Sequence, residues 1–150
     1  MPPAQPPERL LCDTSFVAHV RARRAKPERY RHWDADLLKR IDTSILAISV
    51  ISLAEARYGY LNAGWGPKRI AEEEHRLASF LQLPLTASDL DEWARLRHLC
   101  KEEGLSMSDN DLWIAAAAIT RTHPLVTCDK DQERLEQGSA LEVIYLPPPC

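Results

Sequence analysis

Short apolar runs alternate along this chain with longer segments in which apolar positions recur every three or four residues. Four of the runs are rich in Val, Ile and Leu and predict buried strands. They cover residues Arg9–Asp13, Ile45–Ile51, Leu125–Cys128 and Leu141–Leu146. Strands that are buried on both faces carry such continuous runs, so the pattern favours a sheet inside the molecule.

Helical periodicity fills most of the segments between these strands. In the first half of the chain we expect a helix from about Ser15, capped by Thr14 or Ser15, a helix over Asp34–Ile41, and a helix from a Ser52 cap to Gly64 or Gly66. Two further helices are expected from Pro67 to Pro84 and from a Ser88 or Asp89 cap to Gly104. The last two are expected from Asp111 to about Thr120, with Ser108 or Asp109 at the start, and over Lys130–Gln137. The helices that begin near Pro67 and Ser88 are predicted to form an antiparallel pair, packed by their apolar stripes.

This order of strands and helices predicts an α/β fold with a mostly parallel central sheet that is covered by helices on both faces. The 150 residues fit one domain, 1–150, with no internal repeat and no interdomain linker. The proline-rich ends, residues 1–7 and 147–150, are predicted to be frayed.

The composition is ordinary for a globular protein, with 45% hydrophobic and 27% charged residues. No apolar run approaches the ~20 residues that cross a bilayer, and the first residues lack the pattern of a secretory signal. We therefore expect no membrane association and a cytoplasmic location. The four cysteines, at 12, 100, 128 and 150, are widely separated without a CxxC pair, so free thiols are expected.

The formal net charge of −3 gives no overall basic character, but basic residues cluster between positions 21 and 31. Arg23 and Arg24 lie at the centre of this cluster, which is relieved only by Glu28. Such a cluster attracts phosphate groups, and it is equally compatible with an ordinary solvated helix face. Both interpretations stay open at this point.

Acidic residues recur where predicted strands end and helices begin. Asp13 and Asp129 follow predicted strands, Glu55 lies about one turn into a helix, and Asp111 stands in the first turn of another. In a parallel sheet such boundaries meet at one edge, where ligands bind. Carboxylates placed together are costly unless a cation joins them, and oxygen ligands without imidazole or thiolate select hard ions such as Mg²⁺ or Mn²⁺. The leading hypothesis is a site for one or two such ions and hydrolysis of phosphodiesters.

Each acid also has an ordinary structural interpretation. Asp13 suits a helix cap, Glu55 suits an exposed acid paired with Arg57 or Arg69, and Asp109 competes with Asp111 at a helix amino terminus. Asp129 and Asp131 suit a polar turn. Ser15 and Thr127 carry hydroxyl groups close to these acids along the chain, and they are candidates to orient a scissile phosphate.

The order of these residues resembles the PIN-domain ribonucleases, and most closely the VapC toxins of bacterial toxin–antitoxin pairs. The matching segments are Leu11–Ser15, Ser49–Gly59, Ser108–Ala116 and Pro124–Asp131, which together span nearly the whole chain in family order. The resemblance implies a three-layer α/β/α fold and a metal-dependent endoribonuclease that uses Asp13, Glu55 and Asp111. Asp129 or Asp131 would supply the fourth carboxylate. The family often has Phe directly after the acid that corresponds to Asp131, and this chain has Gln132 there. We interpret this substitution as a difference in packing.

The resemblance also implies an RNA substrate (tRNA, rRNA or mRNA), a VapB-like antitoxin that blocks the site, and commonly a homodimer. In that setting Arg23 and Arg24 are candidate RNA contacts. A non-catalytic PIN-like module that binds RNA or protein is the main alternative. A phosphatase of the haloacid-dehalogenase type is disfavoured because it needs a second Asp where Ser15 stands, and a receiver domain because Asp13 has no early acidic neighbour.

Overall fold

Five parallel strands form the centre of the molecule, in the order β3-β2-β1-β4-β5. The strands are β1 (Arg9–Cys12), β2 (Ile45–Ser49), β3 (Leu81–Leu83), β4 (Leu125–Thr127) and β5 (Val143–Tyr145). The computed structural model describes all residues from 1 to 150. The sheet confirms the predicted parallel arrangement and adds one short strand, β3, at an edge that the sequence pattern missed.

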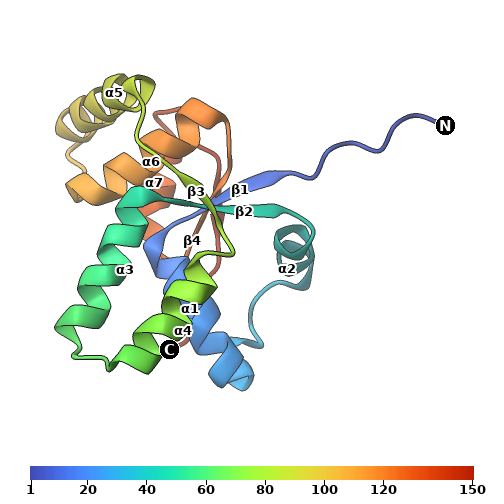
Figure 1. Cartoon of the computed structure of the whole chain (residues 1–150). Helices are drawn as coiled ribbons and strands as arrows, with labels where there is room; N and C mark the ends of the chain where they lie inside the picture. Colours follow the sequence, from blue (N-terminus) through green and yellow to red (C-terminus); the bar gives the residue numbers. More distant parts are fainter.

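Helices cover both faces of this sheet and make three layers (Figure 1). The α-helices are α1 (Thr14–Ala25), α2 (Ala35–Asp42), α3 (Val50–Asn62), α4 (Pro67–Leu77), α5 (Ala87–Glu103), α6 (Asp109–Arg121) and α7 (Glu133–Glu136); 3-10 turns occupy Pro27–Tyr30 and Lys130–Gln132. No helix is both long and apolar enough to span a bilayer.

Two hydrophobic cores lie on opposite faces of the sheet, because side chains alternate along each strand. Leu10 of β1 belongs to one core, together with Phe16 of α1 and Leu77 of α4. Leu11, the next residue of β1, belongs to the other core, together with Leu96 of α5 and the alanines of α6. The three-layer α/β/α prediction is therefore confirmed.

The prediction that the helices beginning near Pro67 and Ser88, α4 and α5, form an antiparallel pair is wrong. Leu77 of α4 and Leu96 of α5 pack into different cores, on opposite faces of the sheet. The antiparallel hairpin is formed instead by α5 and α6, which are joined by a short loop that begins at Gly104 in the left-handed conformation. The short strand β3, between α4 and α5, carries the chain from one face of the sheet to the other.

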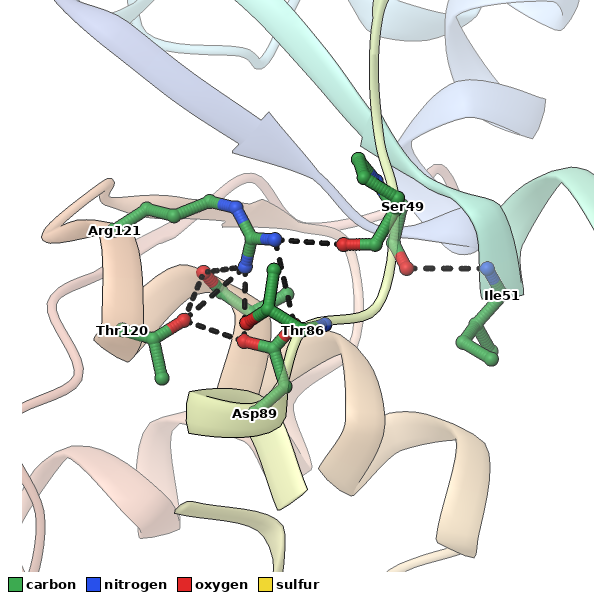
Figure 2. Close-up of polar contacts among 8 residues, drawn as sticks. Ser49, Ile51, Thr86, Asp89, Thr120 and Arg121 are labelled. Carbon is green, nitrogen blue, oxygen red and sulfur yellow. Dashed lines mark hydrogen bonds and ion pairs between the residues drawn. The ribbon is translucent and has the colours of Figure 1, made fainter. Parts of the chain in front are cut away.

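A buried ion pair locks this helical hairpin (Figure 2). Asp89 is fully buried near the start of α5, and the Arg121 guanidinium donates to its Oδ1 over 2.9 Å. The hydroxyl of Thr120 donates to the same oxygen over 2.5 Å, and the backbone N–H of Thr86 donates to Oδ2 over 2.8 Å. Burial alone would raise the pKa of Asp89, but these donors hold it below its usual value.

Two helices begin at a capping residue that was not predicted, and α1 begins at one of its predicted alternatives. Asp13, which was also predicted to suit a helix cap, caps α1 in place of Thr14 or Ser15. Ser49 caps α3 by accepting from the Ile51 N–H, also visible in Figure 2. Thr86 caps α5 in a reciprocal arrangement with Asp89. The cap predicted at Ser108 for α6 is confirmed.

The cysteines are all free thiols, as predicted, and only Cys150 is exposed. Burial raises the pKa of Cys128 to about 12, so this thiol stays neutral near pH 7. At the carboxyl end of the chain, the carbonyl of Pro147 accepts from the Trp33 indole N–H over 2.8 Å.

Candidate functional site

The candidate site lies where the connections of the sheet reverse direction. From β1 the chain goes first to β2 and β3 on one side and then crosses to β4 on the other side. Cys12 is in register with Ile48 of β2 and Val126 of β4, so Asp13 and Thr127 leave the sheet at the same level. Such a reversal leaves a crevice at the carboxyl ends of the strands, where open α/β sheets bind ligands.

Asp13 is buried in this crevice, with 4% of its surface exposed. Its Oδ1 accepts from the Phe16 N–H over 2.9 Å and thereby caps α1. Burial raises the pKa of Asp13 despite its hydrogen bonds, and the charge of Asp111 raises it further. The two interpretations of Asp13, as a cap and as a site residue, are thus compatible with one position.

The hydroxyls of Ser15 and Thr127 both point at Asp13. Ser15 donates to Oδ1 over 2.7 Å, and Thr127 donates to Oδ2 in a short hydrogen bond. Each hydroxyl oxygen also accepts a backbone N–H: Ser15 from Cys128 over 3.1 Å and Thr127 from Asp129 over 2.9 Å. Both hydroxyl groups therefore donate to the Asp13 carboxylate, and their role toward a phosphate stays a prediction.

Asp111 stands in the first turn of α6, behind the Ser108 cap, and is half-buried. Burial raises its pKa, and the nearby charges of Asp129 and Asp131 raise it further against the opposing effect of Ser108. Asp109 faces elsewhere: its carboxylate forms an exposed ion pair with Arg97. The structure therefore favours Asp111 over Asp109 as the acid of the crevice.

Asp129 and Asp131 follow β4 in a tight turn, as the ordinary interpretation also predicted. The Oδ1 of Asp129 accepts from the Asp131 N–H over 3.0 Å. Asp129 is half-buried, whereas Asp131 is exposed and lies 3.9 Å from the Arg134 guanidinium. Asp129 is therefore the more buried of these two acids, and the charges of both raise the pKa of Asp111.

Glu55 lies on α3, and its neighbour across the crevice is Thr14 of α1. The Thr14 hydroxyl donates to Glu55 Oε1 over 2.7 Å and lies 3.0 Å from the Ser52 hydroxyl. The predicted pairing of Glu55 with Arg57 or Arg69 is wrong, because Arg57 binds Glu74 and Arg69 stacks on Trp65. Thr14 directly follows Asp13, and this adjacency is the one signal in the sequence for its role.

The acids fit a hard cation by their chemistry and their charge. The charge of Asp111 raises the pKa of Asp13, and the charges of Asp129 and Asp131 raise that of Asp111. No Lys or Arg forms an ion pair with Asp13, Asp111 or Asp129, whereas Asp131 lies beside Arg134. Buried carboxylates that raise one another's pKa are stabilised when a cation binds. In the conformation described, no three His, Cys, Asp or Glu side chains stand close enough together to hold one ion.

The predicted RNA contacts Arg23 and Arg24 both line a cavity of about 400 Å³ beside Trp33. The Arg23 guanidinium lies 5.9 Å from the ring centre of Trp33, and Arg24 also reaches a second cavity between α1 and α4. The cavity of about 290 Å³ that contains Glu55 is lined by neither of them. Arg21 is the member of the basic stretch that shares this cavity with Glu55.

This fold and this crevice define a class of protein. The model of the family described as PIN domain matches residues 10–138, so the chain belongs to the PIN domain family. The chain is also similar to Ribonuclease VapC5 of Mycobacterium tuberculosis, with 37% identity over 66% of this chain and 75% of that protein. Ribonuclease VapC4 of the same organism is 30% identical over 82% of this chain and 88% of that protein.

Solved structures support the same assignment. One neighbour, described as VapBC-5 from Mycobacterium tuberculosis, a member of the VapBC family of toxin–antitoxin systems, has a TM-score of 0.68 and 30% identity over 93% of this chain and 99% of that chain. Another, VapBC2 from Rickettsia felis bound to a DNA fragment from their promoter, has a TM-score of 0.74 over 91% and 98% of the two chains. At 22% identity this second likeness shows the fold alone.

Proposed function

We propose that this protein is a metal-dependent endoribonuclease and the toxin of a toxin–antitoxin pair. The observation that carries the proposal is the buried carboxylate of Asp13 at the crevice, which Ser15 and Thr127 hold by one hydrogen bond to each oxygen. The ribonuclease names of its relatives agree with this chemistry.

Carboxylates from four elements would hold the ion or ions. Asp13, Asp111 and Asp129 would bind one or two Mg²⁺ or Mn²⁺ ions with Glu55, and Asp131 is the alternative fourth acid. A bound divalent ion supplies Lewis-acid stabilisation of the negative charge that develops on a phosphodiester during hydrolysis. Asp129 is a better candidate than Asp131 for the fourth acid, because Asp129 is half-buried, whereas Asp131 is exposed and adjacent to Arg134.

The residues around these acids would keep them in place. Ser15 and Thr127 fix both oxygens of Asp13, and Thr14 fixes one oxygen of Glu55. Hydrogen bonds that hold single carboxylates in place limit the reorganisation that the site undergoes when an ion and the substrate bind. Ser15, Thr127 and Thr14 are therefore positioning residues in this proposal.

The proposed partners follow from the same relationship. An RNA substrate (tRNA, rRNA or mRNA) would be met in the cytoplasm, and a VapB-like antitoxin would block the crevice. The neighbour described as VapBC-5, a member of the VapBC family of toxin–antitoxin systems, supports the antitoxin. We propose a homodimer as the assembly of the toxin, to be measured by light scattering on the purified chain.

The experiment is RNA cleavage by the purified protein with Mn²⁺ or Mg²⁺, compared with chelator. A mixed pool of end-labelled structured RNAs serves as substrate, and sequencing of the new ends identifies the cleaved class. Asp13→Asn and Asp111→Asn should each lower the rate at least about 100-fold, the scale of losing a charge-stabilising group. Asp109→Asn is the matched control, since Asp109 lies in the same helical turn but binds Arg97.

Two results would count against this proposal. Cleavage that persists in Asp13→Asn and Asp111→Asn would place the chemistry elsewhere or in a contaminant. RNA binding by the wild-type protein without cleavage, with either metal, would favour the alternative of a non-catalytic PIN-like module.

A further inference from the structure

A trough lined by arginines begins at Glu55 and runs along α1 and α4. It consists of two adjoining cavities, of about 290 and 720 Å³, that share Arg21, Trp65, Glu73 and Arg76. The smaller cavity contains Glu55 and Thr14 of the candidate site, and the larger one opens toward Arg24 and Arg69. We call this continuous depression the arginine trough.

Trp65 organises two guanidinium groups in this trough. The guanidinium carbon of Arg69 lies 3.6 Å from the ring centre of Trp65, and that of Arg21 lies 4.7 Å from it. A cation placed over an indole ring is attracted by the negative face of the π-system. Arg21 and Arg69 start from different helices, so Trp65 holds together two charges that would otherwise repel each other.

The carboxylates of the trough do not neutralise it. Glu73 is buried and accepts two hydrogen bonds from Arg76, over 3.1 and 2.5 Å, while Arg21 lies 3.6 Å away. Glu72 is the other acid of the larger cavity, and it is exposed. With Glu55 of the smaller cavity, three carboxylates therefore stand against four guanidinium groups in the trough, and the Arg21 side chain remains 42% exposed.

We infer that the arginine trough binds the phosphates of a single-stranded RNA segment that adjoins the scissile bond. This inference rests on the proposed function. When the acids hold one phosphate of an RNA chain, the neighbouring phosphates of that chain lie against the protein surface beside the acids. The trough adjoins Glu55 directly. Guanidinium groups bind phosphates with paired hydrogen bonds, and a guanidinium plane stacked on an indole also offers a surface for an unpaired base.

The experiment measures RNA binding separately from cleavage. Anisotropy of a fluorescein-labelled oligouridylate, titrated with protein in chelator at several salt concentrations, gives both the affinity and its salt dependence. For Arg21→Gln with Arg69→Gln we expect weaker binding and a slope of log K against log salt that is smaller by about 1.4, since each lost phosphate contact removes about 0.7. Both side chains reach the surface, and thermal unfolding verifies that the fold is kept.

Two further variants make the result specific. Arg95→Gln with Lys101→Gln removes the same charge from exposed positions on α5, across the sheet from the trough, and should leave the slope unchanged. Trp65→Leu keeps every charge but removes the ring that orders Arg21 and Arg69. Its affinity should fall while its slope stays near the wild-type value, because the number of phosphate contacts does not change.

The outcomes separate this inference from the nuclease proposal. Trough-dependent binding by a protein that cleaves no RNA supports the trough and removes the nuclease. Cleavage by the wild-type protein, with unchanged affinity and slope in the Arg21 and Arg69 double variant, keeps the nuclease and overturns the trough. A double variant that loses affinity for a polyglutamate probe but not for RNA also overturns it, in favour of an acidic polypeptide as the occupant.

Discussion

Two buried carboxylates in this molecule have opposite electrostatic fates. Asp89 is 0% exposed and Asp13 is 4% exposed, and each carboxylate accepts hydrogen bonds from a threonine hydroxyl that is distant in the sequence. The pKa of Asp89 is held below its usual value, whereas the pKa of Asp13 is raised above it. At Asp13 burial raises the pKa most, and the charge of Asp111 raises it further. At Asp89 the hydrogen bonds from Thr120 and from its counter-ion Arg121 outweigh the effect of burial and lower the pKa.

This difference distinguishes a structural acid from a functional one. A buried charge that has its own counter-ion fixes two elements relative to each other, as Asp89 does for α5 and α6. A buried charge that faces a like charge is a cost to the fold, and such costs concentrate where a ligand relieves them. The following predictions test this contrast, beginning with the largest expected effect.

Asp89→Ala should lower the free energy of unfolding by about 3 kcal/mol, because it leaves the partly buried Arg121 without its counter-ion. Chemical denaturation of the metal-free protein measures the change. Asp91→Ala, an exposed position on the same helix, is the control and should change stability by less than about 0.5 kcal/mol. Equal losses in the two variants would contradict the role assigned to the ion pair.

Divalent cations should stabilise the wild-type protein by relieving the repulsion between Asp13 and Asp111. At a concentration about 100-fold above the dissociation constant, Mn²⁺ should add about 2.7 kcal/mol to the free energy of unfolding. Thermal unfolding with Mn²⁺, against chelator at matched ionic strength, measures it. The effect should be much smaller in Asp111→Asn; an equal gain in that variant would show that the ion binds elsewhere.

Gln132→Leu should raise the free energy of unfolding by about 1 kcal/mol. Gln132 is fully buried beside the acidic turn, and neither its amide oxygen nor its amide nitrogen has a hydrogen-bond partner. A buried amide without partners costs about 1–3 kcal/mol relative to an apolar group of similar shape. Denaturant unfolding measures the gain, with the exposed Gln137→Leu as control. A loss of stability would show that the amide is satisfied in solution.

The smallest expected effect is a change in the pH dependence of stability. The pKa of Asp111 is raised in the folded protein above its ordinary value of 3.8. Between these two values the folded state binds more protons than the unfolded state, so stability falls as the pH rises through this window. Asp111→Asn should flatten that fall and raise the metal-free stability near pH 7 by about 0.5 kcal/mol. A steeper fall in the variant would contradict the assigned repulsion.

The strands were predictable from the sequence to the extent that they are buried on both faces. The apolar runs located β1, β2, β4 and β5, with ends that differ by a few residues. The strand β3 was missed because it has three residues, Leu81 to Leu83, all at least partly exposed at the edge of the sheet. A strand this short has no periodicity of its own, and its position depends on its pairing with β2.

The acids were predictable at the candidate site, but their contacts were not. Asp13, Asp111 and Asp129 stand at ends of strands and helices, and this pattern located them in one crevice. The pairing of Asp89 with Arg121 joins residues 32 positions apart, so no local pattern shows it. The same limit applies to the hydroxyls: Ser15 and Thr127 were selected as site residues, but only the fold shows that they hold Asp13.

The hydrogen bond between Thr127 and Asp13 joins residues 114 positions apart, across the central strand pair of the sheet. During synthesis, β1 and β2 are both outside the ribosome long before β4 has been translated. Asp13 therefore lacks its hydrogen bond from Thr127 until nearly the whole chain has emerged. An incomplete nascent chain has no assembled crevice, so the timing of translation itself delays the proposed activity until the polypeptide is almost finished.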